Sequence, residues 1–200
     1  CQAVEDALKK QISQERLLNQ VTTQIRKSLD LPVIMATAIA QVREFLELDR
    51  LVIYKFEGSG VNTQNTRSPR LQDWQNYGGC IVYEARATDI IPSVLDYQEQ
   101  TCFSRHSQCW DKYRQGFTLV IDDIETAYAL EECLLNFLRE SQVRAKLAAP
   151  IIFEDKLWGL LIAHQCYNPR QWHDSDKNLL ISIAEQLAIA IHQSELMRSL

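Results

Sequence analysis

Glycine is scarce in this chain, with six residues among 200. Loops that bind the phosphates of nucleotides need closely spaced glycines, because the backbone has to approach the phosphate oxygens. None of the six glycines falls in the spacing of such a loop. We therefore do not expect the chain to hydrolyse nucleotides or to bind a dinucleotide.

Long apolar runs and clusters of positive charge are lacking as well. The longest apolar runs, such as residues 157–163, fall far short of the roughly 18 to 20 residues that a membrane helix needs. No positively charged leader precedes an apolar signal core. The chain has 21 Lys and Arg against 26 Asp and Glu, which gives a net charge of -5. We expect no membrane segment and no nucleic acid as the main partner.

Cysteine is present in a number that does not suit a disulfide scaffold. Six cysteines are few for a disulfide framework in 200 residues, and Cys166 ends an apolar, strand-like segment as a small hydrophobic residue would. We therefore expect a reducing compartment, the cytoplasm. In that setting one unpaired thiol can act as a nucleophile. The six are Cys1, Cys80, Cys102, Cys109, Cys133 and Cys166.

Apolar periodicity predicts helices at both ends of the chain and a sheet between them. Helical spacing covers residues 4–29 and 32–47, and a last helix is expected to start at Asp174 or Ser175 and to reach Leu196. The segments between them are predicted as strands over 51–56, 80–85, 117–121, 147–153 and 157–163, with a short helix over 130–138.

These elements predict a single domain of the α+β class. A hydrophobic fraction of 46% in 200 residues suffices for one core. We expect an antiparallel sheet with the terminal helices on one face and long connections on the other, and a hairpin at residues 147–163 in its centre. The terminal helices are long enough to protrude, and their apolar stripes favour a homodimer.

Two regions have no regular period. Residues 58–78 are polar and are predicted to form a loop insertion. Residues 90–116 mix aromatic, titratable and cysteine side chains, which is typical of a segment that lines a ligand site.

Cys133 is the first candidate for chemistry. It lies at the predicted start of a short helix, where terminal amides lower a thiol pKa while Glu131 and Glu132 oppose them. A buried structural cysteine and a reactive thiol both fit this position. Cys133 and His164 also suit a nucleophile and a base. His164 itself ends a strand-like run, so a histidine satisfied at a strand end and a donor to a ligand are both open.

A zinc site has weaker support. Cys102, His106 and Cys109 have a spacing that, with Cys80 nearby, is compatible with three or four zinc ligands. Structural zinc sites usually show paired knuckles, and this chain has one irregular group. We therefore expect no metal.

The most specific signals are several motifs between residues 17 and 196. One is the run from Leu157 to Cys166, LWGLLIAHQC, followed by Pro169, Arg170, Gln171 and Trp172. The others are residues 112–116, 121–124, 142–147 and 150–151, together with Cys133. These motifs resemble the bilin-binding GAF domains of cyanobacteriochromes, the cyanobacterial relatives of phytochromes. Ordinary GAF domains share the fold but lack the His-Gln-Cys ending and the upstream cysteine.

The resemblance implies a photoreceptor module, not an enzyme in itself, that binds a linear tetrapyrrole, most often phycocyanobilin. Cys133 stands at the family's attachment position, where a thioether to ring A fixes one end of the pigment and ring D rotates in a 15Z/15E isomerisation. His164 matches the family's histidine near ring D. Tyr113, in a matching motif, is expected among the pigment-binding residues.

One departure from the family concerns protonation of the pigment. Leu134 replaces the histidine that usually follows the attachment cysteine, and Lys146 lies twelve residues further on. This pair resembles the green/red protochromic branch and its far-red relatives, in which a carboxylate, a leucine and a lysine control protonation of the bilin. The carboxylate is assigned to Glu99. A nearby ammonium group disfavours a protonated pigment unless an acid compensates.

A second departure concerns Cys102. The stretch Gln100-Thr101-Cys102-Phe103 is similar to the motif of a branch that forms a second, reversible thioether, but Gln100 replaces its aspartate. A second linkage would shift absorption to violet or blue. We favour a single linkage, because Leu134 and Lys146 together match the protochromic pattern.

The resemblance also implies a domain organisation. Residues 1–16 would be a linker or signalling helix, 17–196 the GAF domain and 197–200 the start of a second linker helix. An attached histidine kinase, diguanylate cyclase or chemotaxis module would receive the signal. The alternatives are a GAF domain that binds a diffusible small molecule and a cysteine-dependent enzyme.

Overall fold

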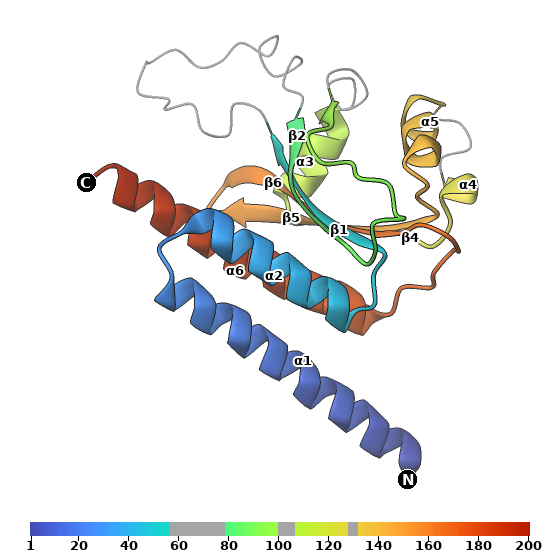
Figure 1. The fold of residues 1–200 in the computed structure, drawn as a ribbon, viewed down its shortest axis with the longest axis horizontal. Coiled ribbons are helices and arrows are strands. Elements are labelled where there is room, and N and C mark those ends of the chain that lie inside the picture. Colours follow the sequence, from blue (N-terminus) through green and yellow to red (C-terminus); the bar gives the residue numbers. More distant parts are fainter. Residues whose placement is uncertain (57–78, 100–106, 128–131) are drawn as a thin grey trace.

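Helices cover one face of a six-stranded antiparallel sheet in the computed structural model of the chain (Figure 1). The strand order is β3-β2-β1-β6-β5-β4, and all five strand pairs are antiparallel. The structure describes residues 1–56, 79–99, 107–127 and 132–200, and within these ranges every side chain except those of residues 99, 107–110 and 133. The predicted insertion at residues 58–78 therefore lies outside the described residues.

Helices begin and end the chain, and the short helices α3, α4 and α5 lie between strands of the sheet. The elements are, in chain order, α1 (Gln2–Lys27), α2 (Leu31–Phe45), β1 (Arg50–Phe56), β2 (Gly79–Arg86), β3 (Gln98–Glu99), α3 (Ser107–Arg114), β4 (Leu119–Ile121), α4 (Ile124–Ala127), α5 (Glu132–Glu140), β5 (Ala145–Phe153), β6 (Lys156–Gln165) and α6 (Asp174–Arg198). Figure 1 shows α2 and α6 side by side across one face, α1 beyond them, and α3, α4 and α5 on the other side. The predicted α+β fold is confirmed.

Side-chain alternation along the strands builds one apolar core on each face of the sheet. On β1, Leu51 and Ile53 belong to the larger core under α1, α2 and α6. Their neighbours Val52 and Tyr54 belong to a second core on the opposite face, together with residues of β2, β5, β6 and α3. A sheet buried on both faces explains why its strands are almost continuously apolar.

The predicted central hairpin is confirmed. Phe153 pairs with Lys156, which leaves the two-residue turn Glu154–Asp155, and Glu154 takes a positive φ of 55°. Gly159 of β6 follows in the middle of the sheet. A Cβ atom here would clash with the carbonyl oxygen of Tyr54. Glycine at this position therefore permits the close approach of β1 and β6.

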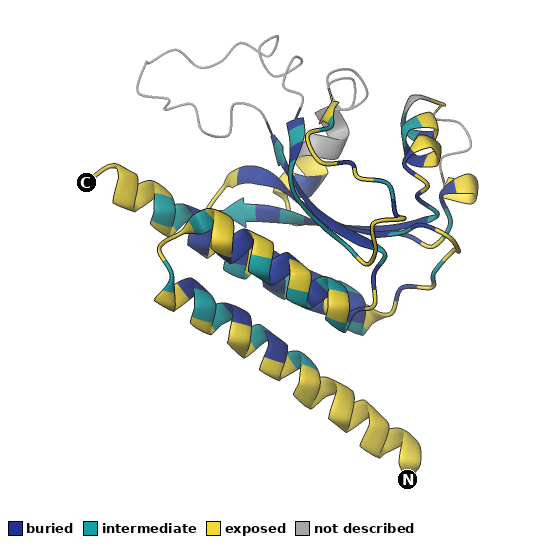
Figure 2. Ribbon diagram, viewed as in Figure 1, coloured by how far each residue is buried: buried dark blue, intermediate teal, exposed yellow. Residues whose placement is uncertain are grey.

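Helix α1 is buried along only half of its length (Figure 2). Leu17, Val21 and Ile25 pack into the larger core, whereas Val4 and Leu8 are 67% and 56% exposed. The apolar stripe of the N-terminal half has no cover from the described residues. This agrees with the prediction that a terminal helix protrudes.

Two details of the predicted secondary structure are wrong. The strand expected at 117–121 begins only at Leu119, because Gly116 (φ 95°) ends α3 and the Phe117 N–H bonds back to the Lys112 carbonyl. The last helix begins after His173, whose N–H donates to the Asp176 carboxylate at 3.0 Å, so neither Asp174 nor Ser175 is the cap.

The short elements β3, α3 and α4 were not predicted. Strand β3 has two residues, and α4 has four. In α3 the residues are mostly polar, so no helical apolar period is visible. The predicted helix at 130–138 corresponds to α5.

Candidate functional site

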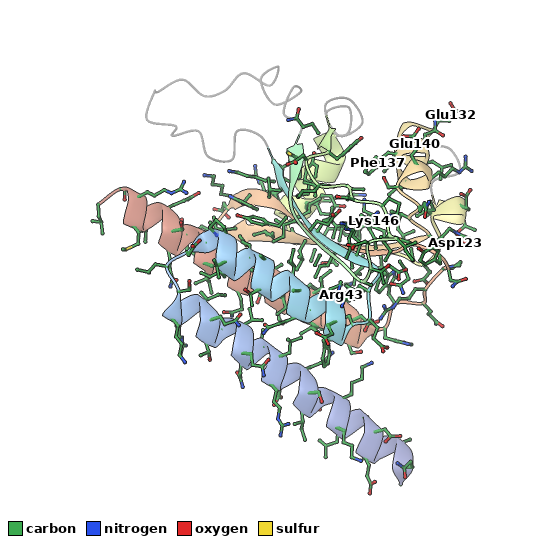
Figure 3. All side chains as sticks on the ribbon, viewed as in Figure 1. Arg43, Asp123, Glu132, Phe137, Glu140 and Lys146 are labelled. Carbon is green, nitrogen blue, oxygen red and sulfur yellow. The ribbon has the colours of Figure 1, made fainter. Side chains whose placement is uncertain are left out.

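The sheet face opposite α2 and α6 carries the predicted site residues that the structure describes. Lys146 of β5 and His164 of β6 have the same strand parity as Ala148 and Ile162, which belong to the second core. Figure 3 places Lys146 beside the sheet, on the side of α5. Tyr113 reaches the same core from α3 and is 4% exposed.

Three basic side chains form a row across this face. Arg50 of β1 is the cross-strand partner of His164, and His164 is the partner of Lys146. The three residues are 0%, 2% and 6% exposed, respectively. Burying a charged group is costly unless it forms hydrogen bonds or ion pairs. We therefore expect these three side chains to belong to a hydrogen-bonded network or to bind a polar ligand.

Arg50 is held by hydrogen bonds to neutral groups. Its Nε donates to Nδ1 of His164 at 3.1 Å, Nη1 to the Pro92 carbonyl at 2.6 Å and Nη2 to the Ser141 carbonyl at 3.0 Å. Burial lowers the pKa of the guanidinium, although at ordinary pH an arginine stays protonated. Arg50 was not identified as a site residue from the sequence. Its only signal is a charged residue at the start of an apolar strand, with the parity of Val52.

The hydrogen bond from Arg50 determines the state of His164. A guanidinium only donates, so Nδ1 must be the unprotonated nitrogen and Nε2 carries the hydrogen. Burial first, then the charges of Arg50 and Lys146, hold the imidazole pKa well below its usual value of 6.5. The ring is therefore a neutral donor, which argues against His164 as a general base for Cys133.

Helix α5 lies on this side of the sheet (Figure 1) and carries the predicted attachment position. Cys133 is its second residue, in the first turn, as predicted; its side chain lies outside the described residues. Leu134 is half-buried against a small cluster that includes Ile121 and Leu138. Phe137 stacks on Tyr97 with ring centroids 4.0 Å apart, and Tyr97 packs on the second core.

Comparisons with known proteins identify the fold family. The sequence model described as "GAF domain" matches residues 30–191. A crystal structure of the cyanobacteriochrome receptor PixJ is 34% identical and superposes with a TM-score of 0.66, covering 81% of this chain and 95% of that one. The chain is a GAF domain of the cyanobacteriochrome type.

Two further relatives extend this assignment. The phycocyanobilin-bound GAF domain of a cyanobacterial phytochrome is 27% identical, with a TM-score of 0.73 and coverage of 92% of this chain and 96% of that one. The circadian input-output histidine kinase CikA of Synechocystis is 46% identical over 196 residues, which are 96% of this GAF domain and 26% of the kinase. This GAF domain thus spans about a quarter of the length of that relative.

Several predicted site positions of the GAF domain fall outside what the structure describes. Glu99 is placed only by its backbone, in β3 opposite Gly79 of β2. Cys102 and His106 lie in the undescribed segment 100–106, so the expectations of a single linkage and of no zinc site stay untested. Searched over the described residues alone, the GAF domain has no cluster of metal-ligating side chains.

A cavity of about 430 Å³ lies elsewhere on the GAF domain. It is formed by the β5–β6 hairpin and the C-terminal half of α6, with Phe153, Trp158 and His192 in its wall. None of the predicted site residues lines it. Among the helices that the structure describes, none is long and apolar enough to cross a membrane.

We expect Cys166 to resist alkylation in the folded GAF domain. It is 4% exposed, and burial raises the pKa of its thiol to about 11, from 9.0. At pH 8 the reactive thiolate is then about 100-fold rarer than for an ordinary thiol. Peptide mass analysis after brief iodoacetamide treatment should show exposed Cys1 modified and Cys166 intact. Equal labelling of the two would contradict the buried position.

Proposed function

We propose that this GAF domain binds a linear tetrapyrrole covalently through Cys133 and reports light-driven isomerisation of that pigment to an attached signalling domain. The observation that carries the proposal is the buried row of Arg50, His164 and Lys146 on the face to which α5 and Tyr113 also contribute. The similar PixJ and phytochrome domains support the same class of function.

The residues of this face suit a bilin chemically. A linear tetrapyrrole combines conjugated apolar rings with ring carbonyls and propionate carboxylates. The second core offers the rings an aromatic and aliphatic surface, including Tyr54 and Tyr113. The buried donors of His164 and Lys146 suit oxygen acceptors, whereas Arg50 already donates to His164 and to the carbonyls of Pro92 and Ser141.

Each predicted residue has a distinct role in this proposal. The thiol of Cys133 fixes ring A from the first turn of α5, and the bound pigment supplies an isomerisable double bond next to ring D. The Nε2–H of His164 donates a hydrogen bond near ring D. Lys146, with Leu134 and Glu99, sets whether the pigment nitrogens are protonated. Cys102 is the site of a second linkage only in the alternative, dual-cysteine form.

The bilin is proposed to be phycocyanobilin. The phytochrome relative that shares 27% identity holds this pigment. Other similar GAF domains hold phycoerythrobilin or biliverdin. Mass analysis of the attached pigment after expression with each of these bilins separates the three.

The terminal helices are proposed to carry the signal. Both α1 and α6 pack on the larger core, and the N-terminal half of α1 keeps Val4, Leu8 and Ile12 exposed. A homodimer through this stripe would place two output domains next to each other, in the cytoplasm. The GAF domain itself is then a sensor, and a histidine kinase, as in the CikA relative, is the proposed output.

Co-expression with bilin-producing enzymes tests the proposal. We expect a coloured protein whose pigment stays attached in denaturant and fluoresces with zinc on a gel, and whose absorbance changes reversibly under light. A colourless but folded product would overturn the proposal and favour a GAF domain for a diffusible ligand. The same host without the bilin-producing enzymes is the control.

A further inference from the structure

The buried guanidinium of Arg50 joins separate parts of the site. It donates from Nε to His164 on β6, and from Nη2 to the carbonyl of Ser141, the residue that directly follows α5. Helix α5 carries Cys133 at its other end. A planar, rigid guanidinium thus connects the proposed ring D histidine with the helix that holds the proposed attachment cysteine.

The carboxylates near Arg50 bond elsewhere, which leaves its Nε for the imidazole. Asp49 accepts from the Cys166 N–H at 2.7 Å, and Glu84 accepts from the hydroxyl of Ser93 and the N–H of Val94, both at 2.6 Å. Arg86 of β2 pairs with Glu84 at 3.3 Å. Among the described residues, no carboxylate lies within ion-pair distance of Arg50.

Among the residues that the structure describes, the charges that face His164 have one sign. Arg50 approaches from β1 and Lys146 from β5, and both disfavour a positive imidazole. Asp49, Glu84 and the thiol of Cys166 act on Arg50 rather than bonding to the ring. The imidazole is therefore enclosed by groups that keep it neutral.

We propose that Arg50 is a positioning residue: it holds His164 as a neutral imidazole with a fixed Nε2–H donor for the pigment, and it ties this donor to the attachment helix α5. One consequence is that His164 neither gives a proton to the pigment nor takes one from it. Protonation of the pigment then depends on other groups of the site. The inference rests on the proposed function for the identity of the acceptor, whereas the state of His164 is a property of the protein alone.

Nitrogen NMR of the protein labelled with ¹⁵N-histidine tests the state of His164 with or without pigment. Comparison with His164→Gln assigns its signals among the four histidines. We expect Nδ1 unprotonated and Nε2 protonated, with no change between pH 8 and pH 5.5. Protonation at Nδ1, or titration of the ring in this range, would overturn the inference even if none of the Arg50 variants folds.

Arg50→Gln tests whether Arg50 is the cause. The shorter, neutral side chain removes both the charge and the donor from Nδ1, so the protonation midpoint of His164 should rise, while burial and Lys146 still hold it below its usual value. Arg43→Gln is the matched control: Arg43 also donates to a backbone carbonyl, that of Leu48, but from α2 on the other face (Figure 3). An unchanged midpoint in Arg50→Gln would overturn the inference.

The pigmented protein provides the second readout. We expect Arg50→Gln to keep its covalent pigment but to gain a spectral transition at the raised His164 midpoint, in addition to the pigment titration that it shares with wild type and Arg43→Gln. In a His164→Gln background, Arg50→Gln should add no further pH dependence. A full additional effect in the double variant would show that Arg50 acts independently of His164. Absence of pigment in wild type would instead disprove the proposed function and leave the NMR result valid.

Discussion

Replacing Cys133 by alanine should abolish covalent pigment attachment completely. A thioether needs a thiol at the start of α5, and the other described cysteines do not offer one in this place. Cys166 is buried with a raised thiol pKa, Cys1 precedes α1, and Cys80 lies half-buried on β2. Co-expression with bilin-producing enzymes, followed by a denaturing gel with zinc and by peptide mass analysis, measures the loss.

Cys80→Ala and Cys102→Ala are the matched controls for Cys133→Ala. Both should keep the pigment in denaturant. An unchanged absorbance of Cys102→Ala in both light states would agree with a single linkage, and loss of a violet or blue form would establish the dual-cysteine alternative. If Cys133→Ala stays covalently coloured, while Cys80 or Cys102 proves indispensable, the attachment assignment is wrong.

The sequence predicted the elements whose apolar residues follow a local pattern. Helical apolar spacing predicted α1, α2 and α6, and two apolar runs around Glu154 and Asp155 predicted the β5–β6 hairpin. These elements are stabilised by burying apolar residues that recur at a fixed spacing within one helix or strand, so the spacing can be recognised in the sequence. The mostly polar α3 and the two-residue β3 have no such period and are held by their neighbours instead.

The sequence predicted where single site residues lie in their helix or strand, but not which of them contact one another. Cys133 in the first turn of a helix and His164 near the end of a strand both follow from local signals. The row that joins His164 to Arg50 depends on pairing between β1 and β6, whose partners are 114 residues apart. Apolar alternation predicts which face of the sheet a residue occupies, but it does not predict which strand pairs with its own. Arg50 was therefore not recognised as a partner of His164.

Lys146→Met should raise the midpoint of the dark-state absorbance titration of the pigmented protein. Lys146 is 6% exposed on the proposed pigment face, and a buried ammonium disfavours a second positive charge on nearby pigment nitrogens. Methionine has a similar length and no charge, so protonation of the pigment becomes easier. For a charge within a few ångströms, the midpoint should rise by about one pH unit or more. The measurement is an absorbance titration in the dark.

Two variants decide whether this effect belongs to the proposed control of pigment protonation. Lys156→Met removes an exposed ammonium at the turn of the same hairpin and should leave the midpoint unchanged. Leu134→His introduces a polar ring next to the proposed attachment cysteine and should also move the midpoint, because an imidazole can exchange hydrogen bonds with pigment nitrogens. If the spectrum were independent of pH in wild type and in Leu134→His alike, Lys146, Leu134 and Glu99 would have no part in protonation, and the basic row would serve binding alone.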